Sequence, residues 1–196
     1  IIADLEKDAW LAVRAVGGSE DPLTAQLVGL ALSGSAECAV YVPLGHEPPK
    51  VARDSDGNPT LAFDPPETNN LPSLSDPSMA PLKTLLESEG HKVGHDLKYT
   101  LQLLDRHGVT LGGVALNTAF DTEIASYCLD PARRDRSLAT LAPDRLNAEL
   151  VSREEITGTG RNRIGLEEAD SAKVMTWAAP RAAILLRLAD LDRKDL

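Results

Sequence analysis

The stretch that decides the fold is VGHDLKYTLQLLDRHGV, which runs from Val93 to Val109. Its first residues close a short apolar segment that ends at Gly94. An amphipathic helix pattern then begins near Asp96 and stops at Gly108. Ligands of open α/β sheets bind where strands end and helices begin. Thr100 stands in this helix, so it either belongs to a functional site or replaces a residue that once worked there.

Three strand patterns come before this junction. Residues 10–16, 24–33 and 37–44 are apolar segments separated by turn-like residues, and they predict three consecutive antiparallel strands. The segment from His46 to Pro77 is polar and rich in proline, which predicts an extended surface loop.

The second half of the chain alternates helix and strand patterns. The pattern predicts a helix from Met79 to Gly90, a strand at 91–94 and a strand region at 113–122. A helix capped by Asp121 then reaches Leu129 and is followed by an irregular basic stretch at 130–143. The chain continues with a Gly-rich loop at 156–165 and a long helix at 166–191, in which Pro180 is expected to cause a kink. Strands followed by alternating helices and strands indicate an α/β domain with a mixed sheet. No internal repeat or domain boundary is visible, so residues 1–196 are predicted to form a single domain.

Composition restricts the function classes. The chain has 30 acidic and 20 basic residues and a net charge of −10, so tight DNA binding by this domain alone is not expected. No apolar run approaches the roughly 20 residues of a membrane span, and the N-terminus lacks a secretion signal, which predicts a cytoplasmic protein. Cys38 and Cys128 stand in apolar surroundings and are predicted to be buried thiols. The missing initiator Met suggests a fragment of a longer chain.

Six motifs follow one another along the chain. They are QLVGLAL (26–32), YVPLGH (41–46), KVGHDLKYTLQLLDRHGV (92–109), FDTEIASYCLDP (120–131), SLATLA (137–142) and EEITGTGRNR (154–163). In order and spacing they resemble the 3′–5′ proofreading exonuclease domain of family A DNA polymerases, of the bacterial DNA polymerase I type. The resemblance covers nearly the whole chain except part of the loop at 47–77. It implies a ribonuclease-H-like fold, in which three antiparallel strands and then parallel strands form a mixed sheet flanked by helices.

The resemblance also implies a two-metal site. The family uses an Asp-x-Glu on the first strand, an Asp on the helix after the fourth strand, and an Asp in the last helix. Together these carboxylates hold two divalent ions about 3.5–4 Å apart, and Mg²⁺ or Mn²⁺ requires oxygen ligands.

None of these carboxylates is found at the matching positions. The family's four carboxylates and its catalytic Tyr fall on Arg14, Val16, Thr100, Arg181 and Trp177. The resemblance therefore implies no catalytic residue, metal or cofactor in this domain. An Arg head can fill the space of a metal and pair with Asp96 or Asp121, and Pro180 is expected to distort the last helix.

Other residues leave alternatives open. Six carboxylates could form a relocated site or serve only as turn residues, helix caps and solvated groups: Glu20, Asp21, Asp96, Asp121, Glu123 and Asp170. His91 and His95 have the spacing of a metal pair, although they flank a predicted strand. His46 and His107 are predicted to lie on the surface.

Two further features bear on nucleic acid. The segment TGTGRNR (157–163) lacks the ending of a phosphate-binding loop and favours a solvated loop. Its basic residues, with Arg133, Arg134 and Arg136, could contact a DNA backbone. Trp10 and Trp177 are interpreted as core or interface residues in preference to stacking platforms for bases.

The leading hypothesis is a catalytically inactive, vestigial exonuclease-like domain. It would be a scaffold beside the polymerase domain of the same chain in DNA replication and repair. The parent would be a DNA-directed DNA polymerase with Mg²⁺ in its polymerase domain. This domain would bind DNA weakly or only through the parent. The protein would be a monomer without membrane contact. The alternatives are an active 3′–5′ exonuclease with relocated metal ligands and a module that binds a DNA end without cutting it. Polymerase motifs after Leu196 would identify the parent.

Overall fold

The computed structural model describes residues 10–48, 68–114 and 118–196. Five strands form one mixed sheet in the order β3-β2-β1-β4-β5. Strands β1 (Trp10–Gly17), β2 (Leu27–Ser35) and β3 (Cys38–Pro43) pair antiparallel, whereas β4 (His91–Gly94) and β5 (Ala119–Asp121) run parallel to β1. The predicted mixed sheet is therefore confirmed. Most of the predicted loop at 46–77 lies outside the described residues.

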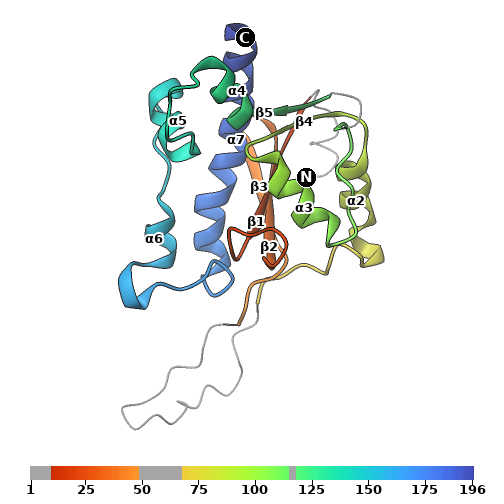
Figure 1. Cartoon of the computed structure of the whole chain (residues 1–196). Coiled ribbons are helices and arrows are strands. Elements are labelled where there is room, and N and C mark those ends of the chain that lie inside the picture. The colour runs from red at the N-terminus through yellow and green to blue at the C-terminus, as the bar shows by residue number, and fades with distance from the viewer. Residues whose placement is uncertain (1–9, 49–67, 115–117) are drawn as a thin grey trace.

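Helices cover both faces of the sheet (Figure 1). On one face lie α2 (Ala80–Glu87) and α3 (Leu97–Asp105), and on the other lies the long helix α7 (Ser171–Asp195). The remaining helices are α4 (Thr122–Leu129), α5 (Leu138–Leu146), α6 (Arg153–Thr157) and two short 3₁₀ turns, η1 (Pro77–Met79) and η2 (Gly160–Asn162).

Alternation along β1 assigns its side chains to these two faces. Leu11, Val13 and Ala15 pack in the cluster that includes α2 and α3. Ala12 and Val16 pack against α7 on the opposite face. Arg14 lies between Ala12 and Val16 in this alternation, so the sheet directs its charge toward the α7 face.

The junction at Gly94 has the predicted form. Strand β4 ends there, and the Asp96 carboxylate caps α3 by accepting a hydrogen bond from the Tyr99 backbone N–H at 3.1 Å. Asp96 has a φ of 55°, in the left-handed region that Asp tolerates better than most residues. This tight turn brings the first turns of α3 close to the end of β1.

Three predictions about elements need correction. The stretch 130–143 is not irregular throughout, because α5 begins at Leu138 and buries Leu141 and Ala142 against α7. The last helix begins at Ser171, where Asp170 caps it, and continues through Pro180 as one helix. Of the strand region at 113–122, only Ala119–Asp121 pairs in the sheet, and residues 115–117 are not described.

The prediction that both cysteines are buried was wrong. Cys38 and Cys128 are exposed, since β3 is an edge strand and Cys128 stands on the open side of the last turn of α4. Apolar neighbours in sequence do not bury a residue when nothing packs over its own face. No helix in the described ranges is long and apolar enough to cross a bilayer.

Candidate functional site

The structure brings together the residues at the five matched positions. Val16 of β1 and Trp177 of α7 belong to one buried cluster. The guanidinium carbon of Arg14 lies 5.9 Å from the centre of a Trp177 ring, and that of Arg181 lies 4.5 Å from it. Thr100 reaches the same region from α3, where its hydroxyl oxygen accepts a 3.4 Å hydrogen bond from the Ala15 backbone N–H. Three distant segments thus meet at the end of β1.

Arg181 is held by backbone carbonyl groups. It is 5% exposed, and its two terminal nitrogens donate hydrogen bonds to the carbonyl oxygens of Trp177 at 2.7 Å and Val151 at 2.8 Å. Burial lowers the pKa of Arg181 to about 10, and the positive charge of Arg14 contributes to the shift. Arg181 therefore ties α7 to the segment before α6.

Arg14 is half-buried and its charge is poorly compensated. Its Nε atom is buried without a hydrogen-bond partner. Burial lowers its pKa, and the negative charge of Asp96 opposes that shift. The expectation that one of these arginines pairs with Asp96 or Asp121 was wrong, because no such ion pair occurs among the described residues.

The Asp residues weighed for a relocated site serve mainly as caps. Asp121 accepts hydrogen bonds from the backbone N–H groups of Asp96, Leu97 and Glu123. Asp21 closes a turn at residues 23–24, and Asp170 caps α7.

Glu20 and Glu123, the two glutamates considered for a relocated site, do not form a metal site with the other described residues. Glu20 is exposed, whereas burial raises the pKa of Glu123, with the nearby charges of Asp96 and Asp121 acting in the same sense. The described part of the chain contains no group of three or more His, Cys, Asp or Glu side chains placed to hold a metal ion.

His91 and His95 both contact other side chains of the fold. His91 stacks on Trp10 with ring centres 4.4 Å apart. His95 is buried, and its Nδ1 lies 2.9 Å from the Thr122 hydroxyl oxygen. Burial lowers the pKa of His95 to about 4, and the charge of Arg14 adds to the shift.

The prediction that His46 lies on the surface was wrong, whereas His107 is exposed as predicted. His46 is 6% exposed because its ring lies between β3 and the segment that precedes α7. Its Nδ1 lies 3.0 Å from the Ala169 carbonyl oxygen and its Nε2 lies 2.9 Å from the Tyr41 hydroxyl oxygen.

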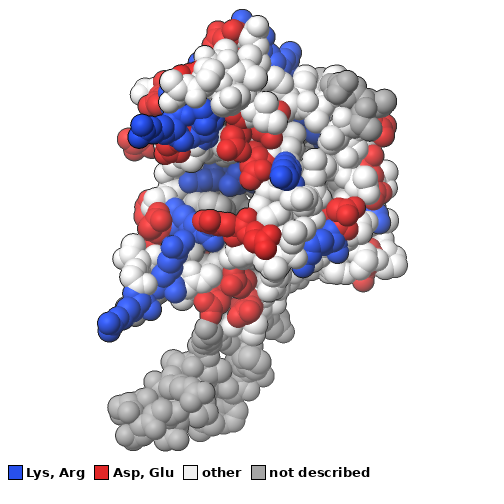
Figure 2. Space-filling model, in the orientation of Figure 1, with Lys and Arg blue, Asp and Glu red and all other residues white. Residues whose placement is uncertain are grey.

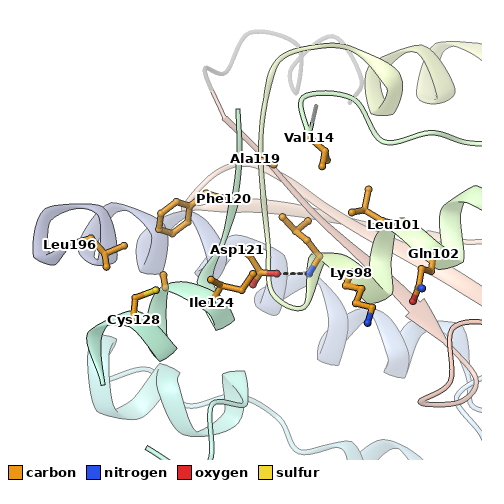
Figure 3. Close-up of a pocket in the computed structure, with 12 residues that line it drawn as sticks. Lys98, Leu101, Gln102, Val114, Ala119, Phe120, Asp121, Ile124, Cys128 and Leu196 are labelled. Atoms are coloured by element: carbon orange, nitrogen blue, oxygen red, sulfur yellow. Dashed lines mark hydrogen bonds between the residues drawn. The ribbon is translucent and has the colours of Figure 1, made fainter. Parts of the chain in front are cut away.

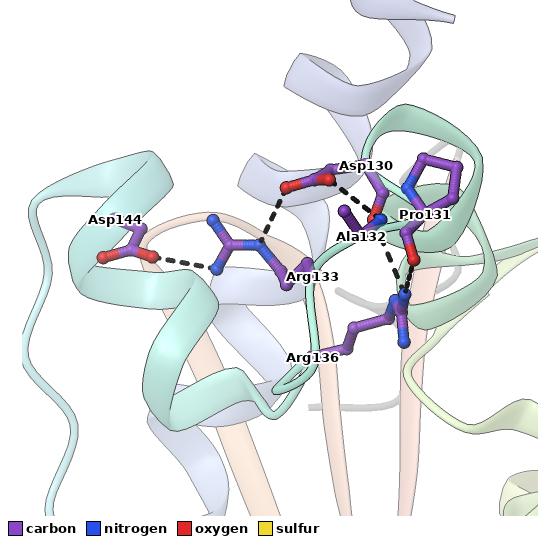
Figure 4. Close-up of polar contacts among 6 residues, drawn as sticks. All are labelled: Asp130, Pro131, Ala132, Arg133, Arg136 and Asp144. Carbon is purple, nitrogen blue, oxygen red and sulfur yellow. Dashed lines mark hydrogen bonds and ion pairs between the residues drawn. The ribbon is translucent and has the colours of Figure 1, made fainter.

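Two arginines of the basic segment after α4 interact with groups of the protein itself (Figure 4). Arg133 pairs with Asp144 at 2.8 Å and with Asp130 at 4.0 Å. Arg136 donates to the carbonyl oxygens of Asp130 and Pro131, and it lies 4.9 Å from the Tyr127 ring centre. Two of the five arginines considered for DNA contact, Arg133 and Arg136, therefore have intramolecular partners.

A hollow lies between α3, β5 and α4 (Figure 3). Its volume is about 570 Å³, and Leu101, Phe120 and Ile124 contribute to its largely apolar lining. Asp121 is its carboxylate, but that group is engaged by the Leu97 backbone N–H at 2.7 Å. Lys98 and Cys128 also line the hollow, which is otherwise largely apolar.

A smaller recess lies at the arginine cluster. Its volume is about 170 Å³, and its lining includes Arg14, Tyr99, Arg153 and Trp177. Arg153 was missed by the sequence reasoning, because it stands in a capping box formed by Ser152 and Glu155 and no spacing relates it to β1. Gly17 forms a wall of the recess, where a side chain would collide with the Tyr99 hydroxyl.

The surface around this site carries both charges. Figure 2 shows a recessed area over α7, between α6 and the start of α3, where Lys and Arg side chains lie beside acidic ones. A divalent cation site requires anionic oxygen ligands. Two guanidinium groups, a valine, an indole ring and a threonine hydroxyl do not fit a pair of such ions.

Comparisons with known proteins agree with this architecture. The chain is 28% identical over 187 residues to DNA polymerase I of Pseudomonas aeruginosa, covering 94% of this chain and 18% of that protein. The chain thus spans about a fifth of the curated relative.

Two solved structures are similar in fold. One is the POL domain of Pol1 from M. smegmatis in complex with DNA primer-template and dNTP. It has a TM-score of 0.64 and 22% identity, with 100% of this chain and 25% of that chain covered. The other is Brucella melitensis NrnC bound to pGG, with a TM-score of 0.67 and 15% identity over 98% of this chain and 76% of that chain.

These likenesses and the observed sheet confirm the predicted ribonuclease-H-like fold. The model of the 3′–5′ exonuclease family found in family A DNA polymerases matches residues 57–190, which is more than half of the sequence. The chain belongs to this 3′–5′ exonuclease family.

Proposed function

We propose that this chain is a non-catalytic 3′–5′ exonuclease-like domain of a DNA polymerase I. The observation that carries the proposal is the chemistry of the residues gathered at the end of β1. Arg14 and Arg181 place two positive charges against Trp177, and Val16 and Thr100 supply no carboxylate. These are the positions at which the family resemblance expects four metal-binding carboxylates and a tyrosine.

Electrostatics supports this reading. Two unit charges 4 Å apart interact by about 4 kcal/mol at an effective dielectric constant of 20, so divalent ions beside two guanidinium groups would be strongly repelled. Metal-assisted hydrolysis needs ions that activate a water and stabilise the leaving oxygen. Without anionic ligands the site lacks the means to hold them.

The role that remains is structural. The curated relative is a much longer DNA polymerase I, and we propose that this domain packs beside a polymerase domain in the same chain. Replication and repair synthesis, with its Mg²⁺, would then belong to that polymerase domain, and this domain would bind DNA weakly or only through the parent.

The direct test is a nuclease assay on the purified protein. Single-stranded and mismatched DNA, labelled at the 5′ end, are incubated with Mg²⁺ or Mn²⁺, and we expect no shortening above a heat-denatured control. The discriminating variants are Asp96→Asn and Asp121→Asn, which remove carboxylates considered for a relocated site. Metal-dependent cleavage that persists through purification and disappears in either variant would overturn the proposal in favour of an active exonuclease.

A further inference from the structure

Three arginines from separate elements converge at the recess beside Trp177. Arg14 comes from β1, Arg153 from α6 and Arg181 from α7. Arg14 and Arg153 line the recess itself. Arg181 does not line the recess, but its guanidinium lies 4.5 Å from the centre of a Trp177 ring and the charge of Arg14 lowers its pKa. The charge of Arg153 likewise acts on Arg14 and lowers its pKa further. The fold thus places the positive charges of these arginines close to one another at the recess.

These cations have no carboxylate within ion-pair distance among the described residues. Arg133, Arg145 and Arg193 do form ion pairs, as Arg145 does with Asp192 at 2.9 Å. Arg14 and Arg153 are half-buried, and like charges held close together repel one another. An anion that enters from solvent would offset this repulsion.

Unused hydrogen-bond donors lie at the same place. The Nε atoms of Arg14 and Arg153 and the indole Nε1 of Trp177 are buried and have no hydrogen-bond partner. Asp96 and Glu123 act on Arg14 only beyond ion-pair distance. Arg14, Arg153 and Trp177 all line the recess, and an oxyanion offers several lone pairs to N–H donors of this kind.

The size of the recess limits the ligand. Its volume of about 170 Å³ corresponds to about five or six water molecules at roughly 30 Å³ each. A tetrahedral oxyanion fits this space, whereas the sugar and base of a nucleotide would have to project outside it. Glu20 also lines the recess and is exposed, so it disfavours an anion without closing the site.

We propose that Arg14 and Arg153 bind a phosphate group in this recess, beside the indole ring of Trp177. Guanidinium groups recognise phosphate through paired, charge-assisted hydrogen bonds. The phosphate is either a free ion or the terminal phosphate of a DNA strand, which present the same chemistry. The inference deepens the proposed function, since it rests on the recess being free of metal ions.

Titration calorimetry of the purified protein with inorganic phosphate tests the site. We expect saturable binding that sodium chloride at matched ionic strength does not reproduce. Arg153→Gln should weaken binding by about tenfold, equivalent to about 1.4 kcal/mol. Glu20→Gln should strengthen it. The matched control is Arg161→Gln, which removes the same charge from an exposed position outside the recess.

Tryptophan fluorescence locates the ligand. The chain has two tryptophans, so Trp10→Phe leaves Trp177 as the reporter, and its emission should change with the same saturation curve as the heat. Oligothymidylate with and without a terminal phosphate then separates the sources. A preference for the phosphorylated strand, competed by free phosphate, identifies a DNA end. Binding of free phosphate without that preference identifies the ion.

The outcomes that overturn the inference are distinct from those that overturn the proposed function. No saturable heat, or equal weakening by Arg153→Gln and Arg161→Gln, would remove the phosphate site but leave the non-catalytic assignment intact. Cleavage of the oligonucleotide in Mg²⁺ would instead remove the non-catalytic assignment.

Discussion

The hydroxyl oxygen of Thr100 accepts a 3.4 Å hydrogen bond from the backbone N–H of Ala15, across 85 positions of sequence. Strand β4 pairs with β1 only as far as Ala12 and Val93. Beyond that point β1 has no paired residue of β4 beside it. The Thr100 side chain of α3 there accepts the hydrogen bond from the β1 backbone. Thr100 therefore connects α3 to the sheet.

Replacing Thr100 by the isosteric Val should destabilise the fold. Both Ala15 and Thr100 are buried, so the substitution leaves a buried N–H without an acceptor and should lower the free energy of unfolding by about 1–2 kcal/mol. Urea unfolding followed by circular dichroism measures the change. Thr110→Val, at an exposed position, is the control, and equal losses from the two variants would contradict this role.

The substitution Thr100→Asp should not create exonuclease activity. A single carboxylate cannot hold two divalent ions, and the other matched positions hold Arg14, Val16 and Arg181. The variant and the unsubstituted protein are compared on 5′-labelled single-stranded DNA with Mn²⁺. Robust, metal-dependent digestion by Thr100→Asp alone would mean that the other ligands lie elsewhere and that the matched positions are misassigned.

Arg181→Ala should destabilise the protein by about 2–4 kcal/mol. The change leaves the carbonyl oxygens of Trp177 and Val151 without their charged donor and removes packing from the Trp177 ring. Arg187→Ala, on the exposed side of the same helix, should cost less than about 0.5 kcal/mol. Chemical denaturation of both variants decides the matter, and a loss below 1 kcal/mol for Arg181→Ala would show that this buried arginine is not needed to hold α7 in place.

Acid should weaken the fold through His95. Burial lowers its pKa to about 4 in the folded state, below the usual unfolded value of about 6.5. The unfolded chain therefore binds more protons between these values, and stability falls as pH drops from about 6.5 toward 4. The full difference is about 3 kcal/mol at 1.36 kcal/mol per pKa unit.

Unfolding free energies at pH 7 and pH 4.5 test this assignment. His95→Gln should have a shallower pH dependence than the unsubstituted protein, whereas His91→Gln should retain the original slope. Identical slopes for the His95 variant and the unsubstituted protein would place the acid sensitivity elsewhere.

Manganese should not stabilise the protein in a saturable way. A ligand that binds only the folded state contributes about 2.7 kcal/mol at a hundredfold excess over Kd, which is visible as a rise in Tm. Because the matched positions supply no carboxylate and two positive charges, we expect Mn²⁺ to match Ca²⁺ at equal ionic strength. Stabilisation that saturates at micromolar Mn²⁺ and is lost when one candidate carboxylate is substituted would support a relocated metal site.

The sequence by itself determined the order of elements and several of their ends. Apolar segments bounded by turn residues mark β1 and β2, and side-chain caps mark the starts of α3 and α4 at Asp96 and Asp121. These features are local, since a cap or a periodic face depends on residues within a few positions. The likeness of its motifs to an exonuclease family was also legible without coordinates.

Only the tertiary structure decided which distant residues meet. Helix α5 escaped recognition because its apolar positions acquire meaning only against α7, and His46 is buried because Ala169 lies across from it, 123 positions away. Arg153 reaches the recess beside Arg14 for the same reason. Local periodicity determines which face of an element is buried, whereas the partner of that face is set by how the sheet and helices pack. This packing places Arg14 and Arg181 against Trp177 and brings Arg153 to the same recess.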